Sequence, residues 1–103
     1  MLLLFGAALL EVGGDALIRF GLHSFTTSGK ALFFTSGAIV LFSYGYMVNA
    51  PAWDFGRLLG LYVVFFFVVA QLISWIAFGQ RPSESILLGG AFIVMGGVII
   101  FRG

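Results

Sequence analysis

An uncharged and almost entirely apolar stretch runs from Leu58 to Phe78, and it limits the possible folds more than any other feature. Its polar or amphipathic residues are Tyr62, Gln71, Ser74 and Trp75. A helix at the surface of a soluble protein needs a polar face, which these few residues do not provide. Because about 20 apolar residues in a helix cross a bilayer, we predict that this segment spans a membrane.

The rest of the chain has the same character. Of its 103 residues, 61% are hydrophobic and 9% are charged, whereas soluble domains carry about 25% charged residues. Residues typical of turns interrupt the apolar segments at 21–28, around Pro51 and at 79–83. We therefore predict one all-α integral membrane domain, residues 1–103, with four transmembrane helices. The expected spans are residues 2–20, 30–49, 55–78 and 84–101. Asp54 is the expected N-cap of the third span, because its carboxylate can accept the unpaired N–H groups of the first turn.

Composition also excludes several classes of function. A net charge of +1 gives no basic face for nucleic acid. With no Cys and one His, a Cys/His zinc site cannot form within one copy, and we expect neither a metal nor a cofactor. A serine hydrolase would need Ser43 or Ser74 to reach His23 from within a span, so we expect no enzyme.

Two carboxylates stand in the first span, Glu11 and Asp15. A carboxylate in mid-membrane costs about 2.5 to 3.5 kcal/mol on insertion scales, so both must face protein or water. Their spacing of four places them on one helix stripe with Ala7 and Arg19, which we interpret as the wall of a pocket. Asp15 precedes Arg19 by four residues, the order that favours an ion pair and a structural role. No basic residue stands three or four positions from Glu11 in either direction, so desolvation favours its neutral form and makes it the candidate proton carrier. The alternative is that Glu11 only hydrogen-bonds a neighbouring helix.

Other polar side chains in the spans are less specific. Ser43 in the second span and Tyr62 in the third are candidates for hydrogen bonds to a substrate or to Glu11. Such groups also tie membrane helices together. Tyr62 is the stronger candidate, because a phenol deep in an apolar segment needs a partner.

The fourth span carries two pairs of glycines that repeat after seven residues, Gly89-Gly90 and Gly96-Gly97. Small residues allow membrane helices to approach closely. We predict that these four glycines form a packing seam at a dimer interface.

Charge is almost evenly divided between the two sides of the membrane. The N-terminal amine, Arg57 and Arg102 fall on one side, and Arg19, Lys30 and Arg81 on the other. The positive-inside rule acts through differences in charge near the spans, so both orientations are expected. Four short spans leave no room for a wetted pathway in one copy. We therefore predict a homodimer of oppositely inserted copies, comparable to the inverted repeats of larger transporters.

Three features resemble the small multidrug resistance family of the drug and metabolite transporter superfamily. These are Glu11 within Leu-Glu-Val followed by Gly, the segment Trp75-x-x-Phe-Gly-Gln-Arg81, and the small residues of the fourth span from Gly89. The resemblance covers nearly the whole chain. It implies a proton-coupled antiporter that works as an antiparallel dimer, with Glu11 shared by proton and cation. It also places Gly89 and Gly96 on the dimerisation helix.

The third span departs from the pattern of that family. Tyr62 stands where the substrate-facing Trp would be, and Val64 and Phe66 stand where the family has glycines that bend the helix. The resemblance is therefore to a divergent branch, whose substrate need not be an aromatic drug.

The sequence thus predicts a proton-coupled exporter of small cationic or guanidinium-like compounds. It would be a multi-pass protein of the inner (plasma) membrane of a bacterium. Its partners would be the lipid bilayer, protons, the cationic substrate and a second copy of itself. The alternative is a subunit that pairs with another small membrane protein, either without transport activity or as a translocase of a lipid-linked substrate.

Overall fold

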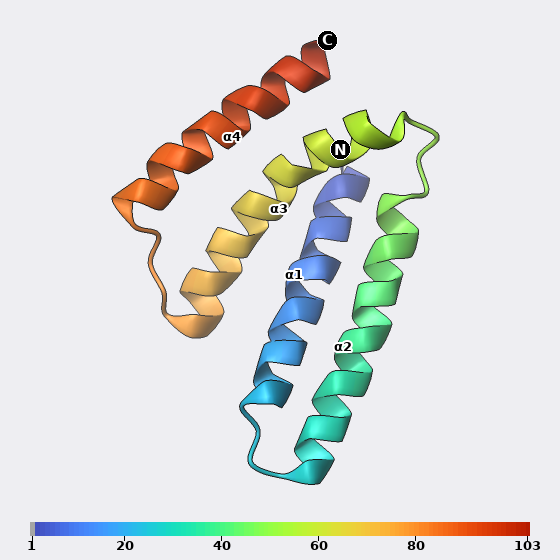
Figure 1. Ribbon diagram of the computed structural model, residues 1–103, viewed down its shortest axis with the longest axis vertical. Coiled ribbons are helices and arrows are strands. Elements are labelled where there is room, and N and C mark those ends of the chain that lie inside the picture. The colour runs from blue at the N-terminus through green and yellow to red at the C-terminus, as the bar shows by residue number, and fades with distance from the viewer. Residues whose placement is uncertain (1) are drawn as a thin grey trace. The chain divides into compact units, whose positions relative to one another are not determined.

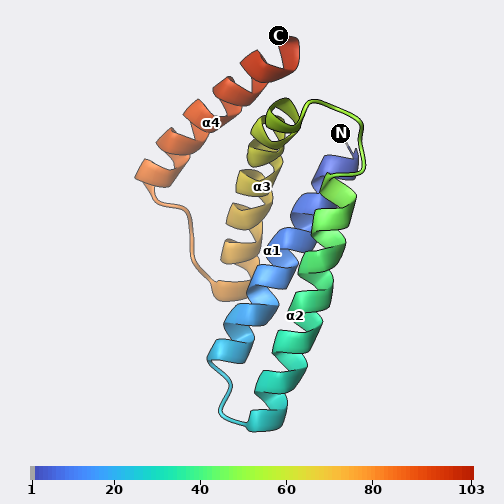
Figure 2. The ribbon, with the colours of Figure 1, turned by 45° about the vertical axis from the view of Figure 1, so that its right-hand side comes forward.

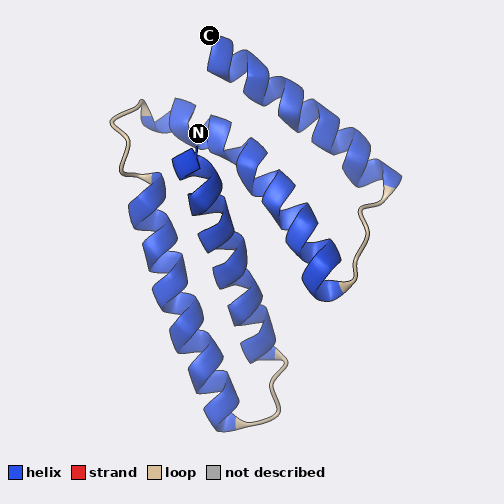
Figure 3. Ribbon diagram, turned by 180° about the vertical axis from the view of Figure 1, so that it is seen from behind, coloured by secondary structure: helices blue, strands red, loops and turns tan. Residues whose placement is uncertain are grey.

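The computed structural model describes residues 2–103, which form four helices joined by three short connections (Figures 1 and 3). The helices are α1 (Leu2–Leu22), α2 (Thr27–Val48), α3 (Phe55–Phe78) and α4 (Glu84–Arg102). The prediction of an all-α chain with four helices is confirmed. The bounds of α3 are those expected, whereas α1 ends two residues later and α2 begins three residues earlier than the turn residues indicated.

Three of these helices, α2, α3 and α4, are long and apolar enough to cross a membrane. This supports the prediction of a membrane protein. The first helix has 21 residues, a sufficient length, but it contains Glu11, Asp15 and Arg19. Its crossing of the membrane stays a prediction.

The chain folds as two compact units, Met1–Ala50 and Pro51–Gly103. Each unit is a helical hairpin: the first pairs α1 with α2, and the second pairs α3 with α4. That both hairpins form a single domain stays a prediction.

The two helices of the first hairpin run side by side (Figure 2), and glycines allow their close approach. A methyl group added at Gly14 of α1 would lie 2.6 Å from Cδ2 of Leu41, and one added at Gly37 of α2 would lie 2.7 Å from Cδ1 of Ile18. The position of the added methyl at Gly37 is also 3.3 Å from the carbonyl oxygen of Gly14. Each helix thus has a glycine where the other helix places a side chain, and this allows close approach of the two backbones.

The second hairpin also packs through its glycines. Gly90 and Gly97 of α4 are buried, and methyl groups added there would overlap Phe67 and Val64 of α3. Near the other end of α4, a methyl group at Gly60 of α3 would lie 3.0 Å from Cδ1 of Ile100. The bulky side chains of α3 therefore fill the positions that α4 leaves empty.

The helix ends follow local hydrogen-bond chemistry. The hydroxyl of Thr26 accepts a hydrogen bond from the Gly29 N–H at 3.0 Å, and the hydroxyl of Ser83 accepts one from the Ile86 N–H at 3.2 Å. These N-caps explain where α2 and α4 begin. We expected Asp54 to cap α3 in the same way, but its side chain makes no cap hydrogen bond. The expectation was wrong because residue type at a helix start does not fix the direction of the side chain.

Candidate functional site

Glu11 lies in the middle of α1, and its side chain is partly exposed. The stripe that it shares with Ala7, Asp15 and Arg19 changes from buried to exposed along the helix. Ala7 is fully buried, whereas Asp15 and Arg19 are exposed. Because 3.6 residues make one turn, residues spaced by four drift around the helix, and this drift carries the stripe away from the packed face. Glu11 lies between the buried and the exposed part of this stripe.

Small residues surround Glu11 along α1. Ala7 and Ala8 are fully buried on the N-terminal side, and Gly14 is buried against α2 on the C-terminal side. A methyl group added at Gly13 would meet no atom within 4 Å. The carboxylate of Glu11 is therefore held on a helix that packs tightly on one flank and leaves space on another.

The pairing of Asp15 with Arg19 stays a prediction. Both side chains are exposed, and exposed pairs of this kind gain little energy from being held together.

Ser43 and Tyr62 are the other predicted site residues. The exposed Ser43 donates its hydroxyl proton to the carbonyl oxygen of Ile39, one turn earlier in α2, at 2.9 Å. Tyr62 of α3 is buried, and its ring centroid lies 6.3 Å from that of Phe66. The first hairpin thus holds Glu11, Asp15 and Ser43, whereas Tyr62 belongs to the second. Their use of a common substrate stays a prediction.

The four glycines of α4 have two different surroundings. Gly90 and Gly97 pack on α3 of the same chain, as described above. Added methyl groups at Gly89 and Gly96 would meet no atom within 4 Å. The dimer interface stays a prediction for all four, and the open surface is at Gly89 and Gly96.

The segment Trp75 to Arg81 ends α3. Gly79 adopts a left-handed conformation with φ 66°, and its N–H donates to the carbonyl oxygen of Trp75 at 3.1 Å. The Ser74 hydroxyl hydrogen-bonds Oε1 of Gln80 at 3.1 Å, and Arg81 lies over the Trp75 ring at 5.3 Å. Glycine adopts positive φ without steric cost, and the cation interacts favourably with the ring. These contacts explain why α3 ends at this segment.

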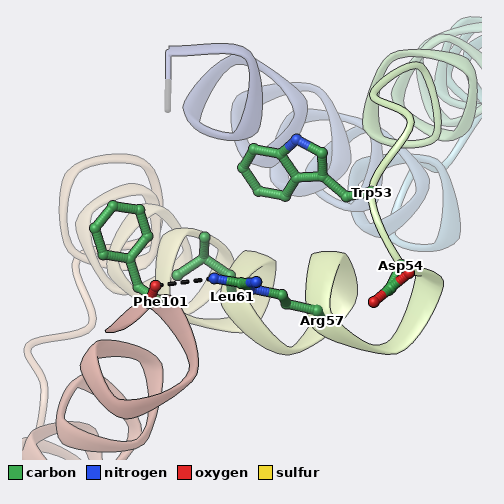
Figure 4. Close-up of a pocket in the computed structure, with 5 residues that line it drawn as sticks. All are labelled: Trp53, Asp54, Arg57, Leu61 and Phe101. Carbon is green, nitrogen blue, oxygen red and sulfur yellow. Dashed lines mark hydrogen bonds between the residues drawn. The ribbon is translucent and has the colours of Figure 1, made fainter. Parts of the chain in front are cut away.

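A cavity in the second hairpin is lined by residues that the sequence analysis did not assign to any site (Figure 4). Its lining residues are Trp53, Asp54, Arg57, Leu61 and Phe101. Nη2 of Arg57 donates a hydrogen bond to the main-chain carbonyl oxygen of Phe101 at 3.0 Å. The sequence signal was the run Trp-Asp-x-x-Arg, which places an aromatic ring, an anion and a cation within one turn of the start of α3.

Comparison of the chain with protein-family models, with curated proteins and with solved structures found no match.

Proposed function

We propose that the chain is a proton-coupled antiporter that exports small cationic or guanidinium-like compounds, with Glu11 occupied in turn by a proton and by substrate. The observation that carries this proposal is the partly exposed carboxylate halfway along an apolar helix. Intramembrane carboxylates are costly and usually functional. The resemblance of three sequence segments to the small multidrug resistance family points in the same direction.

Depth favours Glu11 over Asp15 as the coupling residue. At about 1.5 Å per residue, Glu11 lies about 14 Å from the start of α1 and about 17 Å from its end. Half of a hydrocarbon core of about 30 Å is a similar distance, so Glu11 is near the midplane if α1 spans the bilayer. Asp15 is about 6 Å nearer the surface. A proton or a cation on Glu11 neutralises a charge that water cannot reach easily, so the two ligands compete for one carboxylate.

The functional unit in this proposal is an antiparallel homodimer. Two copies bring two Glu11 carboxylates to one pathway, comparable to the paired repeats of larger transporters. The face of α4 around Gly89 and Gly96 is exposed, with Phe92 64% and Ile99 72% accessible. An apolar face with small residues is suited to a second copy of the helix.

Electrical recordings from solid-supported membranes test this function. Purified protein in liposomes is given guanidinium or tetraalkylammonium ions under a pH gradient, and we expect a transient current that reverses with the gradient. Glu11→Gln removes the titrating group and should abolish the current. The matched control is Glu84→Gln, the same change at the exposed first turn of α4, which should leave the current unchanged.

Wild-type protein that gives no current with any cation would refute the proposal, as would equal currents from wild type and Glu11→Gln. Cross-linking of the purified chain in the same liposomes examines the dimer. Absence of self-association, together with co-purification of an unlike small membrane protein, would instead favour a heteromeric subunit.

A further inference from the structure

The cavity in the second hairpin lies where α3 begins and α4 ends (Figure 4). Its volume is about 340 Å³, at the small end of the range of about 300 to 1,000 Å³ that is typical of ligand sites. The five lining residues within the described part of the chain all belong to this hairpin. A space of this size suits a compact polar group.

One side of the cavity offers positive charge. Figure 4 shows Arg57 extending from the first turn of α3 towards Phe101, with Leu61 beside it. The bond to the carbonyl oxygen of Phe101 uses one of the five N–H donors of the guanidinium, which fixes the group and leaves other donors for a ligand. Asp54 provides no side-chain cap for α3. The N-terminal dipole of the helix therefore also favours an anion here.

Trp53 and Asp54, in contrast, favour a cation. Trp53 lies across the cavity from Arg57, and Asp54 lies at its edge (Figure 4). Trp53 is 45% exposed, so much of its indole surface is accessible. An ammonium ion gains from the face of an indole and from hydrogen bonds to a carboxylate.

The ligand that complements both sides of the cavity is a zwitterion, in which an anionic group and an ammonium group are close together. We propose that the cavity binds the headgroup of an aminophospholipid of the surrounding membrane, with the phosphate on Arg57 and the ammonium group between Asp54 and Trp53. The apolar surfaces of Leu61 and Phe101 receive the glycerol and the first carbons of the acyl chains. One cation and one anion in the lining favour a zwitterionic headgroup over a purely anionic one.

The position of the cavity supports a lipid as the source of this headgroup. Both α3 and α4 are long and apolar enough to cross a membrane. The start of α3 and the end of α4 lie at the same end of the hairpin, where Arg57 bonds the main chain of Phe101. This end therefore meets one surface of the bilayer, the region where Trp side chains are enriched. The proposal does not depend on Glu11 or on transport.

Fluorescence of Trp53 tests the proposal in the full chain. The chain has two Trp residues, so Trp75→Phe leaves Trp53 as the single reporter. In detergent, this protein is titrated with short-chain phosphatidylethanolamine, and we expect a saturable change in emission. Phosphatidylglycerol of the same chain length lacks the ammonium group and should bind about tenfold more weakly, as expected for loss of one charge-assisted hydrogen bond.

Two substitutions and one control assign the contacts. Arg57→Gln should weaken the binding of phosphatidylethanolamine about tenfold. Asp54→Asn should remove most of the preference over phosphatidylglycerol, and it leaves the helix intact because its side chain makes no cap hydrogen bond. Arg102→Gln changes the same charge at the same end of the hairpin, outside the cavity lining, and should have no effect.

Three results would overturn the proposal. The first is equal binding of both lipids by the parent protein. The second is an unchanged preference in Asp54→Asn, which is decisive even if Arg57→Gln fails to fold. The third is saturation by free phosphoethanolamine at the same concentration as the lipid, which would assign the cavity to a soluble zwitterion.

Discussion

The two hairpins join their helices in different ways. In the first, glycines of both helices alternate with inserted side chains, so α1 and α2 approach closely and in a defined register. In the second, side chains of α3 lie over Gly90 and Gly97 of α4, Ile100 of α4 lies over Gly60 of α3, and the two helices contact each other less extensively. The first hairpin holds a carboxylate near its middle, whereas the uncharged middle of the second hairpin lies between polar helix ends. The comparison teaches that the more extensive helix packing accompanies the helix with the costly charge, and that the less extensive packing leaves α4 open at Gly89 and Gly96.

The largest expected loss of stability comes from Gly14→Leu in the first hairpin. The new side chain collides with Leu41, and overpacking of this kind costs about 1 to 3 kcal/mol or more. Unfolding of the purified protein by sodium dodecyl sulfate, followed by circular dichroism, measures this loss. Gly13→Leu is the matched control, because its added Cβ would meet nothing within 4 Å, and it should be tolerated. Equal loss in the two variants would show that the reciprocal contact does not hold the hairpin.

A smaller effect is expected from Gly97→Ala in the second hairpin. The added methyl group overlaps Val64, which we expect to cost about 1 to 2 kcal/mol in the same unfolding assay. Val64→Ala in the same chain should restore much of the loss, because it removes the colliding atoms. Gly56→Ala, at an exposed position of α3 where the added methyl group meets no atom within 4 Å, is the control and should cause no loss. Failure of Val64→Ala to compensate would contradict the packing of Val64 over Gly97.

The smallest effects are expected at the helix starts. Thr26→Ala in the first hairpin and Ser83→Ala in the second each remove a cap and should cost about 1 kcal/mol. Asp54→Ala removes no cap bond and should change the unfolding free energy by much less. A cost at Asp54 equal to that at Thr26 would mean that its carboxylate does cap α3 in solution.

The helices were predictable because apolar length and turn residues act locally. Residues 55–78 were correctly bounded, since Pro51 and Asp54 precede the segment and Gly79 ends it. The start of α2 was predicted three residues too late, because Thr26 is a residue typical of loops but acts here as the N-cap of the helix. Local chemistry therefore sets the helices to within a few residues.

The surroundings of the candidate sites were less predictable. The bond from Arg57 to Phe101 joins residues 44 positions apart, and no local pattern reveals it. The division of the α4 glycines into a packed pair and an open pair also depends on how α3 lies against α4. Glu11 was identifiable because its cost in a membrane depends mainly on its own position in the sequence.

Arg57 bonds a main-chain oxygen at position 101, and every amino acid supplies that atom. The ring of Phe101, in contrast, lines the cavity. A substitution at this position can therefore change the shape of the cavity wall without removing the hydrogen bond between the two helices. Evolutionary substitutions at position 101 could change which ligands the cavity binds without destabilising the hairpin that contains it.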